Sequence, residues 1–290
     1  MRFITFAKDG VETVGIRIDH ELVDLSIAAP RLPRTLVGLI ETDNLREAGA
    51  AAKNAGSDAR RSLEGLKYLP VIPRPPKIFG FGRNYGSHTG ERPATPGFFL
   101  SSHTRLAAHN ESLIVPKISK TFDYEAEVAI IIGIGGKYIA ARDALNHIAG
   151  YTVFNDGSVR GLMTHPTTLS LMKNCDKTGP LGPEMVSPDE LPAGAEGLRV
   201  QLRRNGVTSQ NDTTSSMFWK VPEIIEIASR YQSLEAGDVV ITGTPGGTIV
   251  DRNRGVDMND PSLPYLKDGE IIETEVEGIG ILRNPIVEER

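Results

Sequence analysis

Residues 122–132, FDYEAEVAIII, are the part of the chain that decides its fold. In a β-strand, successive side chains point to opposite faces. One face of this stretch would be wholly apolar, made of Phe122, Tyr124, Ala126, Val128, Ile130 and Ile132. The other would begin with Asp123, Glu125 and Glu127 and turn apolar at Ala129 and Ile131. The pattern predicts a half-buried strand that carries adjacent carboxylates toward its N-terminal end.

Glu125 and Glu127 would repel each other in such a strand. Burying carboxylates is costly unless they are paired or bound to a metal. A hard divalent cation, Mg²⁺ or Mn²⁺, held by oxygen ligands would offset this cost. The alternative is an acidic strand end that is solvated and needs no ligand.

Asp156 is a candidate third ligand. It follows the predicted strand 151–155 and precedes Gly157, so a strand would give way to a loop at this carboxylate. With Glu125 and Glu127 it could complete a three-carboxylate site that leaves positions open for water and substrate. Aspartate before glycine is also common in turns and helix caps, so both interpretations of Asp156 remain open.

The composition is that of an ordinary globular protein. The chain has 290 residues, of which 39% are hydrophobic and 24% charged, as expected for one large domain or for one with a smaller domain beside it. The formal net charge of −5 argues against broad nucleic-acid binding. A single cysteine, Cys175, excludes an internal disulfide. No apolar run approaches the ~18 residues of a membrane span, and a signal-peptide pattern is absent. We therefore expect a cytoplasmic protein without a membrane or nucleic-acid partner.

The proline-rich segment 70–76, PVIPRPP, is the predicted domain boundary. Proline removes a hydrogen-bond donor and fixes the backbone, so this segment is expected to be a semi-rigid linker. Residues 1–69 would form a small N-terminal α/β domain, and residues 77–290 a larger catalytic domain. Many predicted strands and few helices, one of them at 221–231, indicate a β-rich α+β fold and not a doubly wound sheet.

Polar residues outside the acidic strand offer further chemistry. His88 and Glu91 are three residues apart, so on one helical turn they could share a face and together take a proton from water. A solvated surface turn would explain the same spacing. Lys173 lies in an apolar stretch and would either extend its ammonium to solvent or direct it at a buried anion. The sequence lacks zinc spacings, a dinucleotide-binding glycine loop and a nucleophile elbow.

Taken together, these segments resemble the fumarylacetoacetate hydrolase family from Lys77 to about Pro285. The similar segments are GRNYGSH at 82–88, YEAEVAIIIG at 124–133, GYTVFNDGSVR at 150–160, LMKNCDKTGPLGP at 171–183, TTSSMFWKVPEIIEIAS at 213–229 and GDVVITGTPGG at 237–247. No single motif decides the resemblance, but their order along the chain makes it specific. Residues 1–69 resemble the small N-terminal segment of many bacterial members.

The resemblance implies a mixed β-roll around Mg²⁺ or Mn²⁺, and a homodimer. It assigns the metal to Glu125, Glu127 and Asp156. Among catalytic residues, it assigns water activation to His88 and Glu91, and stabilisation of an enolate to Lys173. The residues that would contact the substrate are Arg83, Tyr85, Arg160 and Thr244.

The chain departs from the family's pattern at a few positions near the expected substrate. Ser101 stands where lysine is frequent, and Lys177 where threonine is frequent. Gly161 and Met163 replace a usual Asp and Gln. Each change would remove or reverse a polar contact with the substrate. The loop after Gly247 is also longer than is typical.

The resemblance implies a Mg²⁺- or Mn²⁺-dependent hydrolase that cleaves a carbon–carbon bond in a small anionic β-diketo acid of the acylpyruvate type, in aromatic or sugar-acid catabolism. Water activated by His88 and Glu91 would attack the distal ketone, and an enolate would leave. The alternative is a decarboxylase or isomerase of an oxaloacetate-like or hydroxy-dienedioate keto acid, which needs no attacking water. A ligand-binding protein without catalytic activity is the third hypothesis.

Overall fold

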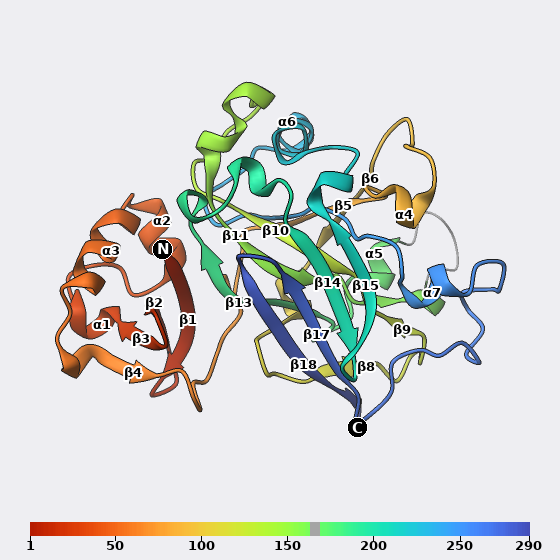
Figure 1. The fold of residues 1–290 in the computed structure, drawn as a ribbon, viewed down its shortest axis with the longest axis horizontal. Coiled ribbons are helices and arrows are strands. Elements are labelled where there is room, and N and C mark those ends of the chain that lie inside the picture. The colour runs from red at the N-terminus through yellow and green to blue at the C-terminus, as the bar shows by residue number, and fades with distance from the viewer. Residues whose placement is uncertain (163–168) are drawn as a thin grey trace.

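Mixed β-sheets dominate the computed structural model, which describes residues 1–162 and 169–290 (Figure 1). Within these residues the larger sheet has 11 strands in the order β4-β3-β2-β1-β13-β11-β10-β16-β5-β6, with β7 paired to β13. The strands are β1 (Arg2–Lys8), β2 (Val11–Ile18), β3 (Glu21–Asp24), β4 (Arg60–Ser62), β5 (Ile78–Gly82), β6 (Gly97–Ser101), β7 (Leu106–Ala107), β10 (Ala126–Ile132), β11 (Ile148–Asn155), β13 (Gly179–Val186) and β16 (Val239–Ile241). The predicted β-rich α+β class is confirmed.

A second sheet packs against the first. Its order is β15-β14-β17-β18-β8, with β8 (Leu113–Val115), β14 (Arg199–Arg204), β15 (Val207–Thr213), β17 (Ile271–Val276) and β18 (Gly280–Glu288). Strands β10 and β11 contact β14, β17 and β18 across the interface. Val128, Ile130, Val200, Leu202 and Ile272 are among the buried side chains of this main core.

The stretch 122–132 has the predicted alternation of faces but is buried on both of them. Its even-numbered apolar residues join the core between the sheets, whereas Ala129 and Ile131 join a second core on the other side of the large sheet. The half-buried strand of the prediction is therefore wrong. The strand is also interrupted: β9 (Phe122–Asp123) pairs with β12 (Ser158–Val159), and β10 starts again at Ala126.

The N-terminal residues extend the large sheet. They contribute β1 to β4 and the short helices α1 (Leu25–Ala28), α2 (Leu36–Glu41) and α3 (Leu45–Lys53), seen at the left of Figure 1. β1 pairs with β13, and Phe3 lies opposite Met185. Val71 and Ile72 of the proline-rich segment are fully buried, so this segment packs against its neighbours along part of its length. The division into domains at 70–76 stays a prediction.

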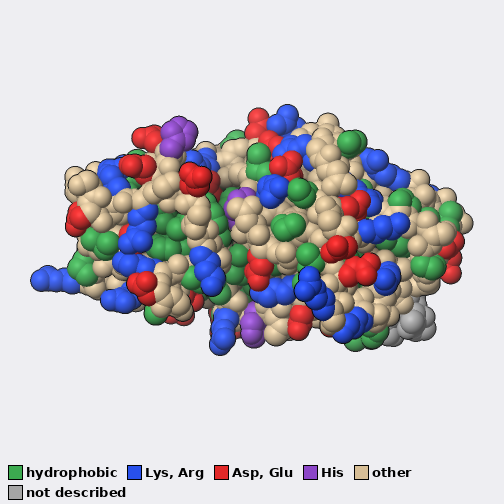
Figure 2. Space-filling model, turned by 90° about the horizontal axis from the view of Figure 1, so that it is seen from below, with side chains coloured by type: hydrophobic (Ala, Val, Ile, Leu, Met, Phe, Trp, Pro, Cys, Tyr) green, Lys and Arg blue, Asp and Glu red, His purple; other side chains and the backbone are tan. Residues whose placement is uncertain are grey.

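The remaining helices lie beside the larger sheets. α6 (Val221–Tyr231) has the predicted bounds, with proline in its first turn. Three short helices, α4 (Gly86–Thr89), α5 (Leu169–Met172) and α7 (Ile249–Arg252), flank the candidate site. None of the described helices is long and apolar enough to cross a membrane. On the face shown in Figure 2, acidic and basic side chains are interspersed, unlike the continuous basic stripe of a nucleic-acid-binding surface.

Candidate metal centre

The antiparallel pairing of β10 with β11 brings the three predicted carboxylates together. Ala126 lies opposite Asn155, so Glu125 and Glu127 flank a position that is next to Asp156. The backbone N–H of Asp156 donates to the Glu125 carbonyl at 2.8 Å. One carboxylate oxygen from each of the three residues lies within 4.8 Å of the others, and the described residues contain no other such group of potential metal ligands.

Glu127 is the carboxylate that most needs a cation. It is 2% exposed, and it forms no ion pair with a described residue. Its Oε2 accepts a hydrogen bond from the Gly243 N–H at 2.7 Å. Burial, with the negative charges of Asp156 and Glu125, raises its pKa well above the ordinary value. An all-oxygen donor set with an uncompensated buried carboxylate fits a hard divalent cation such as Mg²⁺ or Mn²⁺.

Glu125 is held ionised by two cations. Burial alone would raise its pKa, but Lys173 and Arg160 outweigh burial and lower it to about 2. The Lys173 ammonium lies 2.8 Å from Glu125 Oε2 and 2.6 Å from Asp156 Oδ2. The Arg160 Nη2 lies 2.6 Å from Glu125 Oε1. Both predicted cations therefore reach the carboxylate cluster.

Asp123 has a different role from its neighbours on the same strand face. Its Oδ2 accepts hydrogen bonds from Arg160 Nε at 3.0 Å and Nη2 at 2.8 Å. Its Oδ1 accepts the Ile249 N–H at 2.9 Å. Asp123 thus fixes Arg160, which in turn contacts Glu125, and most of the guanidinium is already engaged by protein.

A cavity of about 200 Å³ opens onto the carboxylates. It is lined by Gly82, Arg83, His88, Gly97, Phe99, Glu125, Glu127, Asp156, Arg160, Leu169, Met172, Lys173 and Thr244. Eight of the ten predicted site residues are in this lining; Tyr85 and Glu91 are outside it. The apolar wall formed by Phe99, Leu169 and Met172 was not predicted from the sequence, because nothing in those residue types indicates a site.

His88 faces the cavity and is oriented by a carboxylate other than the predicted one. Its Nδ1 lies 2.7 Å from Oδ2 of Asp251 in α7, while Glu91 is exposed and its carboxylate forms no hydrogen bond or ion pair with a described residue. Burial would raise the pKa of Asp251, but His88 lowers it. An ionised carboxylate only accepts, so Nδ1 of His88 donates and Nε2 is left for the cavity. The long loop after Gly247 was noted in the sequence, but nothing there linked Asp251 to His88.

The four residues predicted to contact the substrate differ in whether their polar groups are free to bind it. Arg83 is exposed at the cavity, has φ of 63°, and forms no hydrogen bond or ion pair with a described residue. Tyr85 is fully buried, and its hydroxyl has no hydrogen-bond partner in the described structure. The Thr244 hydroxyl donates to the Ala126 carbonyl and accepts from Gln210, each at 2.9 Å. Arg83 is therefore the predicted contact with the most freedom to bind a ligand.

The positions that depart from the family's pattern are not in the described cavity wall. The Lys177 ammonium pairs with Glu111 at 3.0 Å. A Cβ on Gly161 would lie 2.6 Å from the Ser119 hydroxyl, so this position has little space for a side chain. Met163 lies outside the described residues. The effect of these changes on the substrate stays a prediction.

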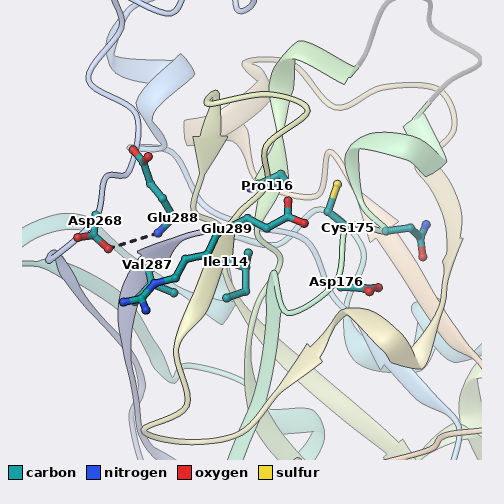
Figure 3. A pocket seen from close by; sticks show the side chains of 10 residues that line it. Ile114, Pro116, Cys175, Asp176, Asp268, Val287, Glu288 and Glu289 are labelled. Carbon is teal, nitrogen blue, oxygen red and sulfur yellow. Dashed lines mark hydrogen bonds between the residues drawn. The ribbon is translucent and has the colours of Figure 1, made fainter.

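A larger hollow of about 740 Å³ lies at the C-terminus (Figure 3). Asn174, Cys175 and Asp176, which follow Lys173, form part of its wall, with Glu288 and Glu289 among the other lining residues. The Glu288 N–H donates to Asp268. Its carboxylates do not form a group of metal ligands by the distances that define the first site, so the smaller cavity is the candidate active site.

Two packed mixed sheets surround a buried cluster of three carboxylates whose oxygens could hold a metal ion. The chain belongs to the fumarylacetoacetate hydrolase family, because the family model "Fumarylacetoacetate (FAA) hydrolase C-terminal" matches residues 77–287.

The chain is similar over nearly its whole length to proteins with assigned activities. It is 32% identical over 307 residues to rat "Oxaloacetate tautomerase Fahd2a, mitochondrial", covering 99% of this chain and 92% of the relative. It is 32% identical over 309 residues to "Oxaloacetate tautomerase YisK" of Bacillus subtilis, covering 99% and 100%. A solved structure, "Fumarylacetoacetate hydrolase (EaFAH)" from Exiguobacterium antarcticum, superposes with a TM-score of 0.84 at 27% identity over 100% of both chains.

These relatives are enzymes by name. The rat protein is mitochondrial by name, so the expected cytoplasmic location stays a prediction. The expected homodimer does too.

Proposed function

We propose that the protein is a divalent-metal-dependent tautomerase that interconverts the enol and keto forms of a small 2-oxo diacid of the oxaloacetate type. The observation that carries this proposal is the His88–Asp251 pair beside the carboxylate cluster. It supplies one oriented proton carrier, whereas the predicted water-activating partner, Glu91, is exposed. The relatives named oxaloacetate tautomerase support the same reaction.

Glu125, Glu127 and Asp156 would hold the metal. When bound, Mg²⁺ or Mn²⁺ would supply a Lewis acid that stabilises negative charge on the substrate's 2-oxygen.

The proton transfer falls to His88. Tautomerisation removes one proton from the enol oxygen and adds one to the neighbouring carbon, or the reverse. Because Asp251 engages Nδ1, His88 can hold the proton at Nε2, and the Asp251 carboxylate stabilises the imidazolium that results. Lys173, buried in the cavity wall, provides an ammonium that favours the anionic form of the substrate.

Cavity size and charge favour a compact diacid. Sites for drug-sized ligands occupy roughly 300–1,000 Å³, and this cavity has about 200 Å³. Arg160 and Lys173 are engaged by buried carboxylates, so Arg83 is the cation with unused donors. A planar guanidinium suits bidentate recognition of a carboxylate, here the one at the far end of the substrate.

Hydrolysis of an acylpyruvate, the first expectation from the sequence, is the second candidate, because His88 could also take a proton from water. The two reactions are separated by incubating the protein and Mn²⁺ with oxaloacetate or an acylpyruvate in H₂¹⁸O. We expect rapid loss of the enol absorbance of oxaloacetate, and no new labelled carboxylate. Labelled carboxylate from the acylpyruvate, without acceleration of tautomerisation, would reject the proposal.

A further inference from the structure

Arg105 is a fully buried arginine directly behind the candidate metal centre. It ends the short turn His103–Arg105 between β6 and β7. Its Nη1 lies 2.7 Å from Asp156 Oδ1 as an ion pair, and its Nη2 donates to the Gly157 carbonyl at 2.8 Å. The guanidinium also lies over the Phe154 ring, with its carbon 5.4 Å from the ring centroid. A buried charge persists only when it is paired in this way.

The two oxygens of Asp156 have different surroundings. Oδ1 faces Arg105 and has no hydrogen bond of regular geometry in the described structure. Oδ2 faces Lys173 on the cavity side, at 2.6 Å. Arg105 is not part of the cavity wall. It therefore contacts the carboxylate from behind and leaves Oδ2 toward the cavity.

We propose that Arg105 is a positioning residue for the metal carboxylate Asp156, and that a lysine introduced at position 101 could supply the same cation to Asp156. The proposal rests on the metal role of Asp156 in the proposed function. Groups that orient metal ligands from outside the ligand shell typically contribute 10–100-fold to metal affinity.

Ser101 connects the two positions. Its hydroxyl accepts a hydrogen bond from Arg105 Nη1 at 3.1 Å and donates to the Lys173 carbonyl at 3.3 Å. Arg105 Nη1 thus lies between Ser101 and Asp156. The Ser101 hydroxyl lies 3.1 Å from Arg105 Nη1, which lies 2.7 Å from Asp156 Oδ1. The ammonium of a lysine at position 101, on its flexible four-carbon stem, could therefore reach Asp156 Oδ1. Ser101 and Asp156 are therefore joined through one atom, Arg105 Nη1.

The test transfers the cation between these positions. Mn²⁺ affinity is measured by titration calorimetry for the wild type, Arg105→Ala and the double variant Ser101→Lys/Arg105→Ala. Arg142→Ala is the matched control, since Arg142 is exposed and its ion pair with Asp143 is on the surface. We expect Arg105→Ala to bind Mn²⁺ about 10–100-fold more weakly, the double variant to recover most of that loss, and the control to match the wild type.

The outcomes distinguish a failure of the proposed role of Arg105 from a failure of the proposed metal-dependent function. A wild type that binds no Mn²⁺ overturns both. A wild type that binds, with Arg105→Ala equal to it, overturns only the role of Arg105. If Arg105→Ala does not fold, the double variant decides: a folded protein with near-wild-type affinity supports transfer of the cation, and an unfolded or weakly binding one overturns it.

Discussion

Replacing Asp251 with asparagine tests the proton carrier at the candidate site. Oδ2 of Asp251 faces His88 Nδ1 at 2.7 Å and accepts the Gly247 and Thr248 N–H groups at 3.1 and 3.3 Å. With three donors aimed at this atom, the amide oxygen of asparagine would take its place and the geometry would be kept. Besides the charge, the substitution removes only the contact between Asp251 Oδ1 and the exposed Arg254 guanidinium, at 3.4 Å.

The magnitude follows from the loss of that charge. Hydrogen bonds to charged groups contribute about 1.5–3 kcal/mol, against about 0.5–1.5 kcal/mol for neutral ones. The difference, about 1–1.5 kcal/mol, would reduce stabilisation of the imidazolium and slow the reaction about tenfold. The assay is the rate of oxaloacetate tautomerisation at saturating Mn²⁺, with metal affinity measured separately.

Glu91→Gln is the matched control, because it removes a carboxylate that is exposed and three residues from His88. We expect its rate to equal that of the wild type. A loss in Glu91→Gln as large as the loss in Asp251→Asn would refute the assignment of Asp251 and restore the pair predicted from the sequence.

Three further predictions concern the metal and the substrate. Glu127→Gln should abolish Mg²⁺ binding in calorimetry; unchanged affinity would show that the ligand assignment is wrong. The raised pKa of Glu127 means that the metal-free protein loses stability as pH rises from the ordinary value of 4.5 through the folded pKa. Bound Mn²⁺ replaces that proton, so the increase in Tm with Mn²⁺ should be larger at about pH 8 than at about pH 5.5, and an equal increase would contradict this. Arg83→Gln should raise KM for a diacid about tenfold or more through loss of a charge-assisted pair, with little effect for a monoacid of similar size, and equal effects on both acids would exclude Arg83 as the anchor.

Much of the carboxylate cluster could be predicted from local patterns. The alternation in 122–132 marked Glu125 and Glu127 on one face, and the strand end at Asp156 marked the third carboxylate. Strand pairing then brings them together, since Ala126 lies opposite Asn155. The helix at 221–231 was equally accessible, because its apolar residues recur at helical spacing and proline stands in its first turn.

Other features depend on contacts that local patterns do not encode. β13, GPLGPEMV, contains two prolines and two glycines that indicate a loop, but pairing with β1 and β11 makes it a strand. Asp251 reaches His88 from the short helix α7, which is distant from His88 in sequence. The burial of both faces of β10 required a second core, which forms only when helices of the N-terminal residues cover the large sheet.

The junction of β1 with β13 also constrains how the polypeptide can be shortened. β13 adjoins β11, which ends next to Asp156. A truncated protein starting at Lys77 would leave the Met185–Val186 end of β13 without its hydrogen-bonding neighbour and would expose apolar surface that now packs against Leu36 and Leu39. Exposed edge strands with unpaired backbone groups promote aggregation. We therefore expect the first 69 residues to unfold in the same transition as the rest of the protein, and their removal to lower its solubility.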